Sequence, residues 1–226
     1  MKPYYQDFGI TIYHGDCREI MPTLEFDSIL TDPPYGMDAD PDSRRFTSQQ
    51  TKWWGNPDRS KVRGARKIKG DAKPFDPAHL LLDKPTILWG ANHYASRLPD
   101  SAGWMLWDKR KGMEHIGRKW PLSEGEMAWT NVSGRLSIFR LRWMGVIRPP
   151  EEKRKWHPHQ KPVALMAWCL SFFKAPGLVL DPYMGAGPVL VACAAAGIPC
   201  IGIEMEEEHC ESAVERLKQG LIPMRK

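Results

Sequence analysis

Leu178-Val179-Leu180-Asp181-Pro182-Tyr183-Met184-Gly185-Ala186-Gly187 is the stretch that decides the fold class of this 226-residue chain. Its first residues form a short apolar run, which is typical of a buried strand that leads into a glycine-rich turn. A helix is expected next over 188–196, closed by Gly197. A second apolar run, Cys200-Ile201-Gly202-Ile203-Glu204, precedes another expected helix over about 206–218. Strands that alternate with helices in this way predict an α/β fold.

The turn and the acidic residues at the two strand ends indicate a nucleoside-binding site. The small residues from Gly185 to Gly187 let a ligand approach the backbone, and Glu204 can accept hydrogen bonds from a ribose diol. The dinucleotide fingerprint is not met, because Leu190 stands where its third glycine is expected. A carboxylate at Asp181 disfavours a pyrophosphate and favours a cationic ligand, and S-adenosylmethionine fits. The alternative is an ordinary tight turn between a strand and a helix.

The N-terminal part of the chain also has strands that end near acidic residues. Residues 9–14 alternate as a strand does, and Asp16 is placed to cap a short helix over 17–24. A strand over 26–31 then leads into a second loop, Asp32-Pro33-Pro34-Tyr35-Gly36. Because ligands gather at the carboxyl ends of parallel strands, we expect this loop to lie beside the glycine-rich turn.

The loop from Asp32 to Gly36 has the chemistry of a rigid ledge for a flat molecule that bears an amine. Pro33 and Pro34 fix φ and remove two N–H donors, and they hold residue 32 extended. A planar ring can stack on Tyr35 while its amine donates to the Asp32 carboxylate and to the Pro33 carbonyl. The alternative is a strand-end turn with a helix-capping aspartate and a packed tyrosine.

The composition is that of a soluble protein with one sizeable core. The apolar fraction is 42%, the N-terminus has no apolar signal core, and no apolar run is long enough to span a bilayer. The five cysteines show no Cys-x-x-Cys spacing, and an odd number does not suit a disulfide framework. We therefore expect a single domain over residues 1–226 in the cytoplasm, and no membrane partner.

Positive charge is concentrated between residues 42 and 73, where ten Lys or Arg face three Asp within a chain of net charge +5. This segment lacks apolar periodicity, so we expect a basic mobile loop over about 37–75. Tryptophans lie beside several basic residues, which suits a polyanion with stackable bases. The alternative is a solvated loop and ordinary core tryptophans.

The middle of the chain predicts further sheet and short helices. A connector over 148–161 leads to Pro162, expected at the first helical position of an apolar helix through Phe173. His157 and His159 lack accompanying ligands at metal spacing, so no metal site is expected. The other expected elements are helices over 76–83 and about 92–98, and strands over 85–89, 103–107, 126–130 and 135–143.

Three stretches taken together resemble the DNA amino-methyltransferases, which methylate the exocyclic nitrogen of adenine or cytosine. The Asp32-Pro33-Pro34-Tyr35 ledge resembles the catalytic motif of that family. The turn at 181–187 resembles its cofactor motif, Asp-Pro-Phe-x-Gly-Ser-Gly, with Tyr183 in place of Phe. The run at 157–162 resembles His-Pro-Thr-Gln-Lys-Pro. The order of the motifs is that of the circularly permuted beta class, and the likeness covers roughly 9–36 and 157–217.

The resemblance implies a seven-stranded, mostly parallel, doubly wound sheet, with S-adenosylmethionine as cofactor and DNA as partner. Glu204 would hold the ribose, Asp16 would lie near the adenine edge, and Gln160 and Lys161 would lie near the methionine part. The remaining cofactor residues would be Asp181, Tyr183, Gly185 and Gly187. The residues expected to bind phosphates are Arg44, Arg45, Lys61, Arg63, Arg66, Lys67, Arg140 and Arg142.

The implied reaction is methylation of adenine N6, because an initial aspartate in the ledge is more typical of adenine enzymes. The alternatives are methylation of cytosine N4, of RNA or of a protein glutamine, and an inactive DNA-binding regulator. The segment over 131–156 is short for a region that recognises a DNA sequence. Either the sequence preference is therefore relaxed, or the loop over 37–75 also takes part in recognising the bases. A restriction enzyme as companion and the oligomeric state stay open, with a homodimer among the alternatives.

Overall fold

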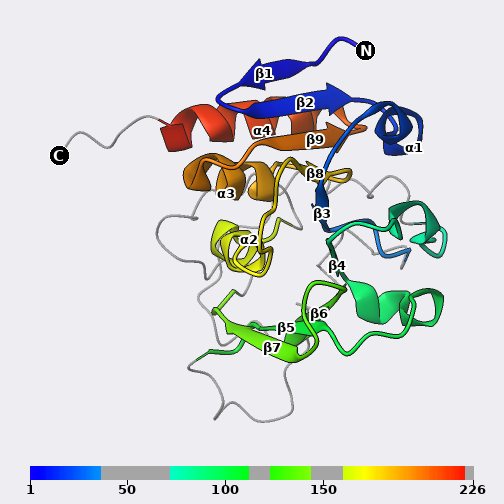
Figure 1. Cartoon of the computed structure of the whole chain (residues 1–226). Coiled ribbons are helices and arrows are strands. Elements are labelled where there is room, and N and C mark those ends of the chain that lie inside the picture. The colour runs from blue at the N-terminus through cyan, green and yellow to red at the C-terminus, as the bar shows by residue number, and fades with distance from the viewer. Residues whose placement is uncertain (37–71, 112–122, 144–159, 222–226) are drawn as a thin grey trace, which may run out of the picture.

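The computed structural model describes residues 1–36, 72–111, 123–143 and 160–221. Among these residues, nine strands form one sheet, with helices and 3-10 turns on both of its faces (Figure 1). The strands are β1 (Tyr5–Asp7), β2 (Ile10–His14), β3 (Ser28–Thr31), β4 (Thr86–Trp89), β5 (Trp104–Asp108), β6 (Gly125–Thr130), β7 (Leu136–Arg140), β8 (Val179–Asp181) and β9 (Cys200–Glu204). The helices are α1 (Cys17–Ile20), α2 (Val163–Leu170), α3 (Pro188–Ala196) and α4 (Glu207–Leu221).

The strand order is β1-β2-β9-β8-β3-β4-β6-β5-β7, and it brings together strands from opposite ends of the chain. β3 pairs in parallel with β8 on one side and with β4 on the other, while β6 runs antiparallel between β4 and β5. The described part therefore has two strands more than the seven expected. β1 and β7 are the two edges of the sheet, and β1 gave no signal because its three residues carry no apolar pattern.

The central strands are buried on both faces, which is why they read as continuous apolar runs. Ile10 and Ile12 of β2 pack with α2, α3 and α4 in one core cluster. Ile201 and Ile203 of β9 point to the other face, where α1 and the 3-10 turns cover them. The doubly wound α/β fold is thus confirmed, with one face covered mostly by short turns.

Several local predictions are confirmed at the residue level. The Asp16 side chain caps α1 by accepting a hydrogen bond from the Arg18 N–H at 2.9 Å. α3 spans Pro188–Ala196 as expected, between Gly187 and Gly197, which both have positive φ. Pro162, however, is the extended N-cap of α2 and not its first helical residue.

The two helices expected over 76–83 and 92–98 are wrong. Only 3-10 turns form there: η5 (Ala78–Leu80), η6 (Ala91–His93) and η7 (Ala95–Arg97). Pro77 and Pro85 bound the first segment, and the non-helical backbone of Tyr94 separates the two turns of the second. The remaining short 3-10 turn, η1 (Met21–Thr23), continues α1.

The boundary of the expected mobile loop needs a correction at its C-terminal end. Phe75 is buried in the core, and a Cβ placed on Gly36 would overlap the backbone of Lys73 to Phe75. The chain therefore returns to the sheet beside the loop after β3 before residue 75, and the rest of the basic loop, 37–71, lies outside the described residues. Of the expected recognition segment, residues 131–143 are described and contain β7.

Candidate active site

The loop after β3 and the glycine-rich turn after β8 follow two neighbouring strands in the middle of the sheet, on the side where the parallel strands have their carboxyl ends. Because the two strands are parallel, their carboxyl ends meet there. Thr31, the last residue of β3, connects the two strands by donating a hydrogen bond from its Oγ1 to Asp181 Oδ1 at 2.6 Å. The backbone N–H of Tyr183 donates to the same oxygen at 3.2 Å. The two sequence motifs are thus tied together through one buried carboxyl group.

The side chains of the loop after β3 belong to a compact polar network. Tyr35 donates its hydroxyl proton to Asp32 Oδ1 at 2.5 Å. The Lys161 ammonium donates to Asp32 Oδ2 at 2.5 Å and to the Tyr35 hydroxyl oxygen at 2.7 Å. Its nitrogen also lies 2.9 Å from Glu126 Oε2. Glu126 is bound on its other oxygen by Lys109.

The charges in this network determine its protonation. Burial by itself would raise the pKa of Glu126, but Lys161 and Lys109 outweigh burial and bring that pKa to about 2. Burial likewise opposes the charge on Lys161, yet Asp32 and Glu126 raise its pKa above the ordinary lysine value. The network therefore holds a glutamate and a lysine that are both ionised at neutral pH.

The Tyr35 ring has aromatic and backbone neighbours on the turn after β4. It stacks on the His93 ring with centroids 5.0 Å apart and planes inclined by 13°. Gly90 lies so close to the same ring that a Cβ there would overlap it. The turn after β4 therefore sets the position of the tyrosine ring.

The glycine-rich turn borders open space, which is what an approaching ligand requires. Gly185 has φ +51°, and nothing lies within 4 Å of a Cβ built on it. Its N–H donates to Glu204 Oε2 at 3.0 Å, and the Glu206 N–H donates to Oε1 at 2.7 Å. Burial acts to raise the pKa of Glu204, but His209 and the two backbone bonds lower it overall. Glu204 is thus a fixed carboxylate beside an open backbone turn.

Asp181 is only 2% exposed, and burial raises its pKa to about 7. The hydrogen bonds from Thr31 and from the Tyr183 N–H act in the opposite direction and limit the rise. A carboxyl group of this kind can change its charge near neutral pH when a cation binds beside it.

Tyr183 and Asp16 lie on the side of the site that α1 covers. The Tyr183 hydroxyl lies 2.8 Å from His79 Nε2, and its ring meets Phe75 edge-on at 5.7 Å. Asp16 forms an ion pair with Arg18 at 2.7 Å, and the hydrogen bond from Arg18 lowers the pKa of Asp16.

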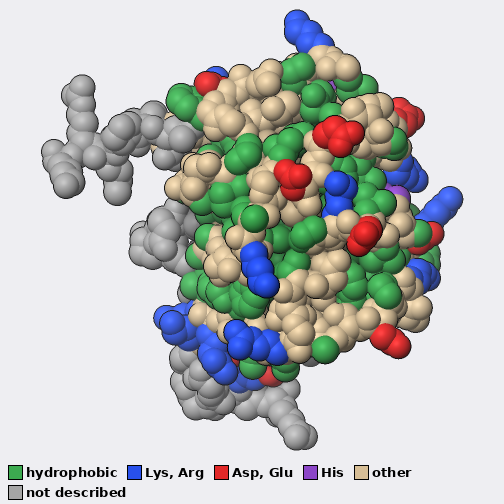
Figure 2. Space-filling model, viewed as in Figure 1, with side chains coloured by type: hydrophobic (Ala, Val, Ile, Leu, Met, Phe, Trp, Pro, Cys, Tyr) green, Lys and Arg blue, Asp and Glu red, His purple; other side chains and the backbone are tan. Residues whose placement is uncertain are grey.

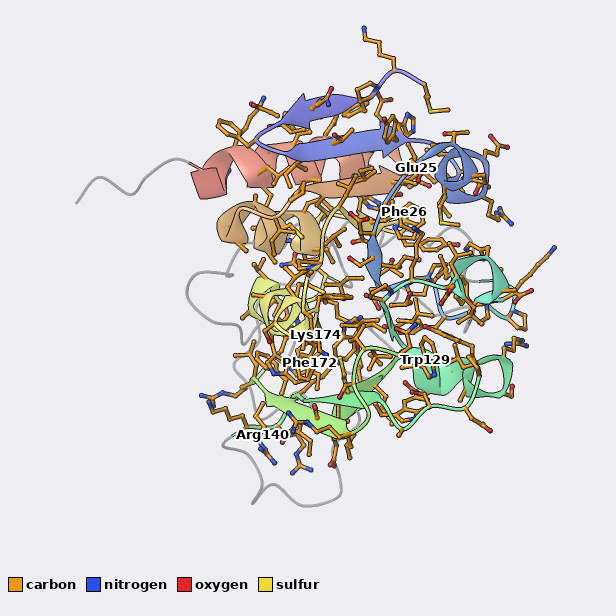
Figure 3. All side chains as sticks on the ribbon, in the orientation of Figure 1. Glu25, Phe26, Trp129, Arg140, Phe172 and Lys174 are labelled. Atoms are coloured by element: carbon orange, nitrogen blue, oxygen red, sulfur yellow. The ribbon has the colours of Figure 1, made fainter. Side chains whose placement is uncertain are left out.

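The remaining predicted residues that the structure describes lie on or beside other elements, α2 and β7. Gln160 is buried next to Lys161, and the contacts of Lys161 run to the loop after β3. Arg140 is exposed, with its Nε 3.6 Å from Asp108, and Arg142 is exposed as well. Figure 3 shows Arg140 at the β7 end of the molecule. The other six predicted phosphate ligands, between Arg44 and Lys67, lie outside the described residues.

Sequence reasoning missed several residues of the site: Thr31, His79, His93, Lys109 and Glu126. Thr31 is the last residue of β3, and Lys109 follows the end of β5, so strand ends were a usable signal for both. Glu126 comes from the start of β6, which is antiparallel and so brings its first residues to the same edge. No spacing in the sequence announces that reversal.

Within the described parts of the chain, no group of three or more His, Cys, Asp or Glu side chains could hold a metal ion. A search of the same residues for a helix long and apolar enough to cross a membrane found none.

Comparison with known proteins shows which proteins this chain is similar to. A family model described as DNA methylase, N6_N4_Mtase, matches residues 107–215. The Type II methyltransferase M.ScaI of Streptomyces caespitosus is 24% identical over 96% of this chain and 84% of its own length. The PvuII DNA methyltransferase structure, which is cytosine-N4-specific, superposes with a TM-score of 0.59 at 13% identity and covers 100% of this chain and 91% of its own. The M1.HpyAVI–SAM complex superposes with a TM-score of 0.53 at 24% identity and covers 92% of this chain and 100% of its own. Over residues 107–215 the chain thus resembles the N6/N4 DNA methylases, and the M1.HpyAVI structure that shares its fold was solved in complex with SAM.

Proposed function

We propose that this chain transfers a methyl group from S-adenosylmethionine to the exocyclic N6 of adenine in DNA, with cytosine N4 as the alternative target. The observation that carries the proposal is the hydrogen bond between Thr31 and Asp181, because it joins the loop that would hold the amine to the turn that would hold the donor. Such adjacency is what a direct transfer between two bound molecules requires.

The cofactor would lie along the glycine-rich turn, where Gly185 faces open space and Gly187 begins α3. Glu204 would accept hydrogen bonds from the ribose hydroxyls, since its carboxylate is already fixed by backbone amides. Asp181 offers a negative charge to a cationic ligand. We assign Asp16 and Tyr183 to the adenine side of the same pocket. When bound, S-adenosylmethionine supplies an electrophilic methyl group on its sulfonium.

The target base would lie against the loop after β3. A base inside a duplex is out of reach, so it must leave the stack first. Its amine would donate to Asp32 and to the Pro33 carbonyl, and Pro34 would keep the loop stiff while the ring stacks near Tyr35. These two hydrogen bonds favour a pyramidal nitrogen whose lone pair is free. The nitrogen, held by Asp32 and the Pro33 carbonyl, would then be placed for in-line attack on the sulfonium methyl group, and its proton would pass to solvent.

The DNA backbone would be held by basic residues, which set affinity and not sequence choice. Arg140 and Arg142 are exposed at the β7 end, within the described part of segment 131–156. We assign six of the ten basic residues of the loop over 37–75, the predicted phosphate ligands between Arg44 and Lys67, to the same role, within a single domain over residues 1–226. The name of M.ScaI as a Type II methyltransferase supports a role in DNA modification.

The test is incorporation of tritiated methyl groups into unmodified genomic DNA, followed by nucleoside analysis of the product. The wild type should label N6-methyladenine, and Asp32→Ala should lose about 100-fold or more of the rate, because the amine loses its acceptor. Cofactor affinity, measured without DNA, should stay unchanged in this variant. Label in N4-methylcytosine would select the alternative target, and equal labelling by wild type and variant would reject the role of Asp32.

A further inference from the structure

Lys161 is placed so that all three protons of its ammonium group can be used at once. Its nitrogen lies 2.5 Å from Asp32 Oδ2, 2.7 Å from the Tyr35 hydroxyl and 2.9 Å from Glu126 Oε2. An ammonium has three donors, so these three acceptors match its capacity. The side chain is only 5% exposed and also lies over the Tyr35 ring, 5.3 Å from its centroid.

The partners of Lys161 come from separate parts of the fold. Asp32 and Tyr35 belong to the loop after β3, Glu126 belongs to the start of β6, and Lys161 itself directly precedes the N-cap of α2. Lys109, which follows β5, completes the set by binding the other oxygen of Glu126. The buried Lys161 and the partly exposed Lys109 thus lie beside two partly exposed acidic side chains, two basic groups for two acidic ones.

The consequence for the loop is that two side chains are fixed from two directions. Asp32 accepts a hydrogen bond from Tyr35 on Oδ1 and another from Lys161 on Oδ2, and the two bonds fix the plane of its carboxylate. The Tyr35 hydroxyl donates to Asp32 and accepts from Lys161, which sets the tilt of its ring. Each carboxylate oxygen keeps a second lone pair, so Asp32 can still accept from a substrate amine.

We propose that Lys161 and Glu126 are positioning residues for methyl transfer, which hold Asp32 and Tyr35 in the geometry that the substrate amine requires. This inference rests on the proposed function and assigns Lys161 to the amine side of the site. The resemblance of residues 157–162 to the family's His-Pro-Thr-Gln-Lys-Pro run instead predicts that this lysine lies near the methionine part of the cofactor. The two placements differ in what they predict: loss of a positioning residue slows the chemical step, whereas loss of a cofactor contact weakens cofactor binding.

The test needs a variant that keeps the buried charges balanced. Lys161→Met alone leaves two carboxylates with one ammonium, which is strongly destabilising. Lys161→Met combined with Glu126→Gln leaves Asp32 with Lys109, so the charges still cancel. The matched control is Lys84→Met, because Lys84 also bonds a neighbour, the Phe26 carbonyl at 2.6 Å, and lies over an aromatic ring.

Three measurements are made on wild type, the double variant and the control: cofactor affinity by calorimetry, single-turnover methylation of genomic DNA, and amide hydrogen exchange of the peptide covering residues 28–36. In the double variant we expect cofactor affinity within about twofold of wild type, a turnover rate lowered about 100-fold, and faster exchange of the loop peptide. The control should match wild type in all three.

A double variant with wild-type turnover and wild-type exchange would overturn the inference. Weakened cofactor binding with a normal rate at saturating cofactor would overturn it as well, because Lys161 would then serve the cofactor. If the wild type methylates no DNA, the proposed function fails, and loop exchange alone still decides whether Lys161 and Glu126 fix the loop.

Discussion

Asp181 connects the two halves of the site through a carboxyl group that is sensitive to pH. It is buried, it accepts from Thr31 and from the Tyr183 N–H, and burial brings its pKa to about 7. An ordinary aspartate titrates near 3.9, so the folded protein keeps a proton that the unfolded chain has lost between about pH 4 and 7. The contribution of this group to the free energy of unfolding therefore falls as pH rises through that window.

The same group predicts pH-dependent cofactor binding. A cationic ligand favours the ionised form of Asp181, so the affinity for S-adenosylmethionine should rise from pH 6 to pH 8 and level off above it. Binding near pH 7 should release a proton, which calorimetry in buffers of different ionisation enthalpy detects. Thr31→Val should shift the midpoint of the rise to higher pH, because the Thr31 hydrogen bond lowers the pKa of Asp181.

Asp181→Asn is the control for this titration, since it keeps the shape of the side chain and removes the charge. Its cofactor affinity should be weaker and should vary less between pH 6 and 8. A wild-type slope that persists unchanged in Asp181→Asn would assign the pH dependence to another group, with the His209–Glu204 pair as the nearest candidate.

Residues whose role depends on a local motif could be predicted from the sequence. Residues that reach the site through the direction and order of the strands could not. Asp32, Tyr35 and Gly185 lie in short motifs with a defined backbone shape, so their chemistry was readable. Glu126 reaches the site only because β6 reverses direction, and the motif of Lys161 does not encode that this side chain meets the loop after β3.

The turn between β4 and η6 shows how one element positions another. Gly90 follows β4 directly and has φ +70°. The Tyr35 ring occupies the space where a side chain at this position would lie. His93, at the end of η6, stacks on the same ring. The turn after β4 therefore fixes the position of the Tyr35 ring in the loop after β3.

Gly90→Ala should therefore impair methyl transfer more than its backbone strain predicts. A non-glycine residue with positive φ costs about 1–2 kcal/mol, and here the new Cβ would also displace the Tyr35 ring. We expect a turnover rate lowered at least about 10-fold, measured as single-turnover methylation.

The matched control for this substitution is Gly197→Ala. Gly197 has φ +68°, but nothing lies within 4 Å of a Cβ built there, so only the strain is shared. Gly197→Ala should lose only the stability that the strain costs and keep the wild-type rate, whereas Gly90→Ala should lose more stability and also rate. Equal rates would show that the Tyr35 ring tolerates displacement.

At the level of elements, the sequence predicts buried strands well and short turns poorly. β3, β4, β8 and β9 are buried on both faces, and their apolar runs give their positions to within two residues. The segments over 76–83 and 92–98 have helical composition, yet prolines and Tyr94 reduce them to 3-10 turns. Tertiary context decides such short segments, because isolated turns gain little from propensity.

Across the whole molecule, charge is distributed so that the β7 end is basic. Arg135, Arg140 and Arg142 are exposed there, and Figure 2 shows lysine and arginine side chains gathered over this end of the molecule. β7 is parallel to β5, and β6 runs antiparallel to both β5 and β4, so β7 points the same way as β4 and β3. Arg140, the last residue of β7, therefore lies on the side of the sheet from which the loop after β3 leaves. A duplex held at this end would therefore run close to the site.

This arrangement predicts how salt should act on DNA binding. Each phosphate contact contributes about −0.9 to the slope of log affinity against log salt concentration. Arg140→Ala combined with Arg142→Ala should thus reduce the magnitude of the slope by about 2, measured by fluorescence anisotropy on duplex DNA. The control, Lys2→Ala combined with Lys218→Ala, removes the same charge from exposed positions on β1's flank and on α4. Because net charge falls equally in both variants, a slope that changes equally in both would indicate a general charge effect, and only a change confined to the arginine variant supports phosphate contacts at the β7 end.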